Sequence, residues 1–169
     1  MKERTKIDPE LLPLRMSGVS AGFKASLYTL IALHLLILLS SGFLQKIFLE
    51  GEQFVLVIQT TFLFIFISII SGEFSKWQLS KLTEQHSLEI LLHNVDFLRQ
   101  TVFKGVHITS FILLVEIAII LRFGAPVMEK LPQSFGYIGL VIFVSTPFFF
   151  VATYLAIRNQ FRKLFGGIA

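Results

Sequence analysis

The sequence contains no cysteine, so a disulfide framework, a thiolate metal site and a cysteine nucleophile are all excluded. It also lacks a nucleophile elbow, a phosphate-binding loop, a dinucleotide fingerprint and a His-Glu-x-x-His metalloprotease motif. Charged residues are few, at 15%, compared with about 25% in soluble domains. These absences favour a protein that is not an enzyme and that carries no cofactor.

Apolar residues, by contrast, make up 54% of the chain and gather in four long runs. The runs cover residues 25–43, 53–72, 105–122 and 135–157. A transmembrane helix needs roughly 17–25 residues, and each run reaches that length. None of the runs alternates polar and apolar residues as a barrel strand does. We therefore predict an all-α integral membrane protein, a bundle of four transmembrane helices in a lipid bilayer.

Most of the 15 lysines and arginines lie on one side of the predicted membrane. On that side are Lys2, Arg4, Lys6, Arg15, Lys24, Lys76, Lys81, Arg99, Lys104, Arg158, Arg162 and Lys163, and on the other are Lys46, Arg122 and Lys130. The positive-inside rule places both termini and the connection at residues 73–104 in the cytoplasm. The excess positive charge thus flanks the spans, which indicates lipid headgroups rather than nucleic acid as its partner. We expect a location in a bacterial inner (cytoplasmic) membrane.

This topology divides the chain into five segments. They are a cytoplasmic segment at 1–24, spans 1 and 2 within 25–72, a cytoplasmic connection at 73–104, spans 3 and 4 within 105–157, and a basic cytoplasmic tail at 158–169. Asp8-Pro9-Glu10 predicts the start of a short amphipathic helix that lies on the cytoplasmic surface. Gly18 and Gly22 have the spacing of close-packed helices, but they lie outside the predicted spans, so we give this spacing little weight.

The middle connection contains no glycine or proline after residue 73 and is predicted to be helical. It forms either an amphipathic helix lying flat on the membrane or a helical hairpin with a turn near residues 85–87. Apolar residues within it recur at spacings of 3 and 4, as in a heptad seam: Leu88, Leu91, Val95, Leu98 and Val102. We favour the hairpin, because so narrow a seam suits a helix partner better than a lipid surface.

The opposite face of the same stretch is polar. Its members also follow spacings of 3 and 4: His86, Glu89, His93, Asp96 and Gln100. We interpret them as a solvated cytoplasmic polar face without a bound metal, on a hairpin that docks a soluble protein partner. A zinc-type site and a pH-responsive surface are the alternatives, because histidines and carboxylates one helical turn apart serve both.

Polar residues also lie near the middle of the predicted membrane, and every span contributes to this transmembrane polar layer: His34, Gln59, Thr60, Glu116 and Thr146. A carboxylate at this depth normally faces the bundle interior. In one interpretation Glu116 is protonated or paired with His34 and fixes helix register. In the other, both residues titrate in a pathway for protons, ions or a small polar solute. Haem is disfavoured, because His34 and His107 differ in depth by roughly 10 Å.

Pro147 directly follows the polar layer in the fourth span and is predicted to kink it and to act as a hinge. A single copy of the chain has few helices with which to enclose a pore, so we expect a small homo-oligomeric membrane protein, either channel-like or a sensor. The alternative is an accessory membrane subunit of a larger bacterial secretion, transport or phage-defence assembly. In that case the polar layer is purely structural.

Overall fold

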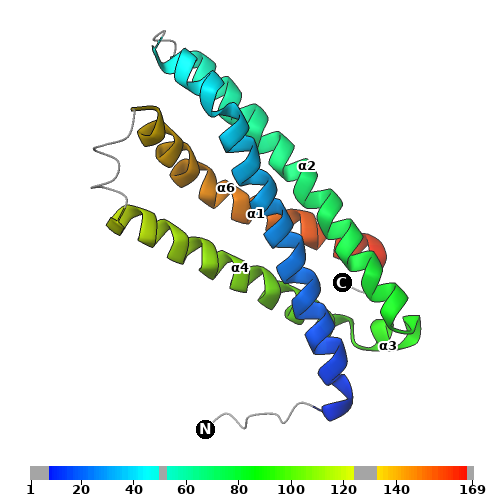
Figure 1. Cartoon of the computed structure of the whole chain (residues 1–169). Coiled ribbons are helices and arrows are strands. Elements are labelled where there is room, and N and C mark those ends of the chain that lie inside the picture. Colours follow the sequence, from blue (N-terminus) through cyan, green and yellow to red (C-terminus); the bar gives the residue numbers. More distant parts are fainter. Residues whose placement is uncertain (1–7, 50–52, 124–132, 167–169) are drawn as a thin grey trace.

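The computed structural model describes residues 8–49, 53–123 and 133–166, which are helical almost throughout and include no strand. In chain order the helices are η1 (Pro9–Leu11), α1 (Leu12–Leu49), α2 (Gln53–Gln85), α3 (Leu88–His93), α4 (Val95–Phe123) and α6 (Gln133–Leu164). Figure 1 shows the long helices assembled as an elongated bundle. The all-α prediction is confirmed for the described residues.

Three helices in the described part of the chain are long and apolar enough to cross a membrane. They cover Pro9–Leu36, Thr61–Gln85 and Val95–Ile119. Their lengths of 28, 25 and 25 residues exceed the roughly 20 residues that a bilayer core requires. This supports the predicted class of membrane protein. The fourth predicted span, residues 135–157, lies within α6, whose first turns have no described side chains, and it stays a prediction.

The first helix begins at the aspartate-proline pair that predicts its start. Asp8 Oδ1 accepts a 3.1 Å hydrogen bond from the Glu10 backbone N–H, and Pro9 stands in the first turn, where its missing N–H removes no helical bond. The 3-10 turn passes directly into α1, which continues to Leu49. Within the described residues 8–24, the chain forms η1 and the first turns of α1, which bury Leu14 in the bundle.

The connection after α2 turns where the sequence predicts, at His86 and Ser87. Ser87 Oγ accepts a 3.4 Å hydrogen bond from the Ile90 N–H and caps α3. A second break follows at Asn94, whose side-chain amide donates a 3.1 Å hydrogen bond to the Ile90 carbonyl oxygen. Asparagine competes in this way with the helical backbone bonds, so the returning arm is divided into α3 and α4.

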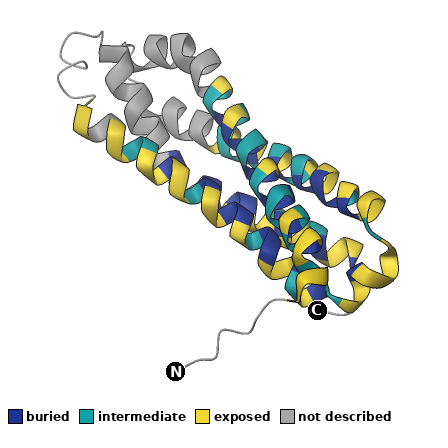
Figure 2. Ribbon diagram, turned by 60° about the horizontal axis from the view of Figure 1, so that its bottom comes forward, coloured by how far each residue is buried: buried dark blue, intermediate teal, exposed yellow. Residues whose placement is uncertain are grey.

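The two arms of this connection make few contacts with each other in the described part of the chain, because α1 lies between them. α1 packs along both α2 and α4, while α6 packs mainly on α2 and touches α4 only slightly. The sequence predicted a buried seam but left its partner open, and the structure identifies that partner chiefly as α1. Figures 1 and 2 place the start of α1, helix α3 and the end of α6 at the same end of the bundle.

The seam is buried in a cluster at this end of the bundle. Leu91, Val95, Leu98 and Val102 are at most 6% exposed, whereas Leu88 is 59% exposed and lies outside the cluster. The rest of the bundle contributes Leu14, Ala21, Ala25, Leu79, Leu82, Ile157, Phe161 and Phe165, the last of which directly follows α6. Figure 2 shows the buried residues along the inward faces of the helices. This end of the bundle therefore has its own apolar core, to which the N-terminal segment and the C-terminal tail both contribute.

A second cluster lies farther along the bundle and contains Leu30, Leu33, Ile67, Leu113 and Phe149. It joins α1, α2, α4 and α6 within the lengths of the predicted spans. Two ionisable side chains lie directly beside this cluster.

Candidate functional site

The two ionisable side chains meet between α1 and α4. His34 Nε2 lies 3.0 Å from Glu116 Oε1, although 82 positions separate the residues in the sequence. His34 directly follows the buried Leu33, and Glu116 lies three positions after the buried Leu113. Packing of the second cluster therefore sets the level of both side chains, and the structure brings together two residues of the predicted polar layer.

The other ring nitrogen of His34 determines how the pair shares a proton. His34 Nδ1 lies 2.8 Å from the carbonyl oxygen of Leu30, one turn earlier in α1. A carbonyl oxygen only accepts hydrogen bonds, so Nδ1 carries a proton and donates it. The contact between Nε2 and Oε1 then holds one proton, bonded either to the carboxyl group or to the imidazole. Both forms have zero net charge, and they differ only in the position of that proton.

The pair is not sealed inside the bundle. The side chain of His34 is 29% exposed and that of Glu116 is 39% exposed. Ile31, Ile112 and Ile119 lie one helical turn away on the same helices, and all three are exposed apolar side chains. The pair is therefore a partly exposed polar site on the otherwise apolar outer face of α1 and α4.

The remaining members of the predicted polar layer are described only in part. Thr146 is buried in α6. Gln59 and Thr60 lie in α2, but their side chains are outside the described part of the structure. Pro147 lies inside α6 and is exposed, and its missing N–H leaves the Phe143 carbonyl without the usual helical donor. The hinge at Pro147 stays a prediction.

A close contact that the sequence analysis gave little weight holds α1 against α4. A Cβ at Gly22 would overlap the backbone of Val102, and a Cβ at Gly105 would overlap the backbone around Phe23. The two helices therefore touch backbone to backbone, which requires the absence of a side chain. Gly18 faces α4 as well, because its Cβ would overlap the side chain of Thr101. The glycine spacing is thus a helix contact, although it lies before the first predicted span.

This glycine contact also fixes the position of the ionisable pair. From Gly22 to His34 on α1, and from Gly105 to Glu116 on α4, the rise is in each case about 17 Å. Between the two levels, Thr109 Oγ1 donates a 3.4 Å hydrogen bond to a backbone carbonyl oxygen of α1. The two helices run in the same direction, so equal rises from a shared contact bring the two side chains to the same level.

The predicted cytoplasmic polar face is distributed over three elements. His86 lies in the turn before α3, is half-buried, and places Nε2 3.2 Å from Ser17 Oγ of α1. Glu89 and His93 are exposed on α3, and Asp96 is exposed on α4 beyond the break. Within the described residues, no group of three histidine, aspartate or glutamate side chains is arranged to hold a metal ion. The structure therefore gives no support to the zinc alternative.

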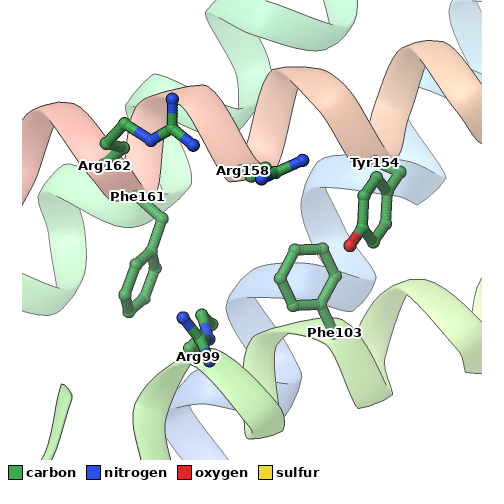
Figure 3. A pocket seen from close by; sticks show the side chains of 6 residues that line it. All are labelled: Arg99, Phe103, Tyr154, Arg158, Phe161 and Arg162. Carbon is green, nitrogen blue, oxygen red and sulfur yellow. The ribbon is translucent and has the colours of Figure 1, made fainter. Parts of the chain in front are cut away.

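A further polar site, which the sequence analysis did not identify, lies between α4 and α6. It is a cavity of about 510 Å³ lined by Arg99, Phe103, Tyr154, Arg158, Phe161 and Arg162, as Figure 3 shows. From the sequence alone, the arginines of this cavity indicated only the orientation of the chain in the membrane. The signal that could have revealed the site is a spacing of four residues from Arg99 to Phe103, and again from Tyr154 to Arg158 to Arg162, which places each set on one helix face.

The ionisable pair and the arginine cavity are thus two of the polar sites that the described residues build between helices. They lie on different levels of α4, at Glu116 and at Arg99. The chain matches no protein-family model, no curated protein and no solved structure.

Proposed function

We propose that this chain is a small homo-oligomeric membrane protein, channel-like or a sensor, in which the His34–Glu116 pair is the ionisable element. Four spans cross a bacterial inner membrane, with residues 1–24, 73–104 and 158–169 in the cytoplasm. The shared end of the bundle supports this topology, because it gathers the start of α1, helix α3 and the end of α6, where most basic residues lie.

The observation that carries the proposal is the 3.0 Å contact between His34 Nε2 and Glu116 Oε1 on an apolar face. The Leu30 carbonyl orients the imidazole, so that the shared proton can move between Glu116 Oε1 and His34 Nε2. The pair is neutral as a unit while it shares one proton, which suits a low-dielectric membrane, and its net charge changes only when a proton enters or leaves. A site of this kind either relays protons or reports their concentration by changing its own net charge.

The exposure of the pair supports an oligomer. Hydrocarbon cannot hydrogen-bond to the 39% of the Glu116 side chain that one copy leaves uncovered. A second copy or a water-filled space between copies would satisfy these polar atoms. A soluble cytoplasmic partner could bind exposed side chains on α3 and at the start of α4, namely Glu89, His93 and Asp96.

The second candidate is an accessory subunit in which the pair is purely structural. The backbone contact at Gly22 and Gly105 favours it, because this contact and the His34–Glu116 bond together tie α1 to α4 at two levels. Interhelical hydrogen bonds in membranes contribute about 0.6–2 kcal/mol each. In this case the polar layer stabilises the subunit and transfers nothing.

The test combines oligomer size in nanodiscs with proton flux into liposomes for wild type, Glu116→Gln, Glu116→Leu and Glu84→Gln. A glutamine at 116 can still donate to Nε2 of His34 but holds no acidic proton. We expect a defined oligomer and a flux that Glu116→Gln abolishes while leaving thermal stability close to wild type. Glu84 is an exposed carboxylate outside the pair, so Glu84→Gln should leave the flux unchanged.

An absence of flux in wild type, or an equal flux in Glu116→Gln, would contradict the pathway. If Glu116→Leu also lowers thermal stability while Glu116→Gln does not, the structural role of the second candidate is the better account.

A further inference from the structure

We propose that the cleft between α4 and α6 binds an anionic phospholipid, with the phosphate in the arginine cavity and an acyl chain in the apolar groove beside it. This inference concerns a different site from the His34–Glu116 pair and does not depend on the function proposed for that pair.

Three arginine side chains line the arginine cavity. Arg99 extends from α4, while Arg158 and Arg162 come from successive turns of α6 (Figure 3). The described ion pairs include one of these residues, Arg99, whose Nη2 lies 3.4 Å from the exposed carboxylate of Asp96. Ion pairs this exposed are weak, so Arg99 remains available to a ligand. Arg158 and Arg162 have no acidic partner among the described residues.

The chemistry of the lining indicates a phosphate ester. Guanidinium groups present parallel N–H donors that match two oxygens of one phosphate, which an ammonium group cannot do. Tyr154 adds a hydroxyl, and its ring lies 4.8 Å from the ring of Phe103, so the two close one side of the cavity with apolar surface. The walls of the cavity contain no carboxylate. An anion held there meets guanidinium donors and aromatic rings from both helices.

A second cavity continues along the same two helices. It measures about 440 Å³, shares Tyr154 with the arginine cavity, and is lined mainly by apolar side chains of α4 and α6. The α4 wall consists of Val106, His107, Ser110 and Leu114, and Phe150, Val151 and Leu155 form the α6 wall. The groove exists because α6 packs on α2 and touches α4 only slightly.

The dimensions agree with one leaflet of a bilayer. From Arg99 to Leu114 the rise along α4 is about 22 Å. The hydrocarbon of one leaflet is about 15 Å deep, with the phosphate region above it. The order of residues is the same on α6, where Arg162 and Arg158 precede Tyr154 and then Phe150 toward the deeper level. A polar cavity followed along the helices by an apolar groove matches a headgroup followed by its acyl chain.

Because the apolar groove continues from the arginine cavity, a phospholipid is favoured over a free phosphate as the ligand. A soluble phosphate ester would occupy only the arginine cavity and leave the apolar groove without a ligand. Basic cavities between transmembrane helices at the cytoplasmic side also have the geometry that retains anionic headgroups. The arginines lie at the bundle end that carries most of the basic residues, so the phosphate would sit at the cytoplasmic surface.

The experiment measures binding of phosphatidylglycerol and of phosphatidylcholine to the detergent-solubilised full chain by native mass spectrometry. The variants are Arg158→Gln/Arg162→Gln, the charge-matched control Lys104→Gln/Lys163→Gln, and Val151→Trp, which fills the groove without changing charge. Lys104 and Lys163 are exposed and lie outside the cavity lining. Inorganic phosphate and glycerol 3-phosphate are added as soluble competitors, and circular dichroism checks the fold of each variant.

We expect wild type to prefer phosphatidylglycerol and the arginine variant to bind it at least about tenfold more weakly, since charge-assisted hydrogen bonds are the strong ones. Val151→Trp should weaken binding too, while the lysine control and the soluble phosphates should have little effect. Equal weakening in the lysine control would overturn the site, because net charge alone would explain it. Competition by millimolar inorganic phosphate with no effect of Val151→Trp would replace the lipid by a free phosphate ligand.

Should the arginine variant fail to fold, Arg99→Gln replaces it, because this exposed residue reaches the cavity from the other helix. Unchanged phosphatidylglycerol binding in Arg99→Gln and in Val151→Trp together would equally overturn the proposal.

Discussion

Replacing Gly105 by alanine is expected to loosen the contact between α1 and α4, whereas the same replacement at Gly72 is not. The added Cβ at Gly105 would overlap the Val19 carbonyl oxygen and the Phe23 backbone nitrogen, and backbone atoms cannot move aside as the end of a side chain can. At Gly72 the added Cβ would meet no atom within 4 Å. Both glycines lie inside helices, so the two substitutions differ only in what surrounds them.

The expected difference in the free energy of unfolding follows from two opposing effects. Alanine is favoured over glycine inside a helix by about 0.5–1 kcal/mol, which both variants gain. Overpacking a tight site typically costs about 1–3 kcal/mol, which only Gly105→Ala incurs. Gly72→Ala should therefore be slightly more stable than wild type. The two alanine variants should differ by about 1–3 kcal/mol, because the helix propensity cancels between them.

The assay is denaturant unfolding in detergent micelles, followed by the fluorescence of Trp77. This residue is the one tryptophan of the chain, and its ring lies 5.9 Å from that of Tyr28, so it reports the packing of α1 on α2. Far-ultraviolet circular dichroism gives the helix content independently. If Gly105→Ala and Gly72→Ala unfold at the same denaturant concentration, the backbone contact between α1 and α4 does not exist in the protein.

Two further predictions test other parts of the fold. Leu98→Ala removes a fully buried side chain and should lower the free energy of unfolding by about 2–5 kcal/mol, while Leu88→Ala, at a 59% exposed position, should change it by less than about 0.5 kcal/mol. Similar losses in the two variants would contradict the burial of the seam. Asp8→Ala removes the cap of the first helix and should lower stability by about 1 kcal/mol, with faster amide exchange in the first turn of α1. Asp8→Asn keeps an acceptor oxygen, so a loss as large as that of Asp8→Ala would show that the cap is not the cause.

The parts of the fold that the sequence predicted are those where a local pattern suffices. Asp8 and Pro9 specify a helix start without reference to the rest of the chain. The spacing of Leu91, Val95 and Leu98 requires one face to be buried, whatever the partner. That partner is chiefly α1, and periodicity contains no information about it, because any apolar helix would satisfy the pattern.

The candidate functional sites, like the fold, were predicted only in part. His34 and Glu116 could be placed at the same depth from the lengths of two apolar runs, and the structure brings them into contact. Their partial exposure could not be foreseen, since it depends on how the helices pack around the pair. The arginine cavity was missed because it joins α4 to α6, and no local pattern relates Arg99 to Arg158.

The backbone contact between α1 and α4 also has a consequence for biogenesis. Gly22 leaves the ribosome roughly 80 residues before Gly105, which at about 5–20 residues per second is a delay of about 4–16 s. During that interval the glycine face of the nascent helix has no partner, and the first two helices must wait in the translocon or in lipid. Products that terminate before α4 would keep this face uncovered, and we expect membrane proteases to degrade them.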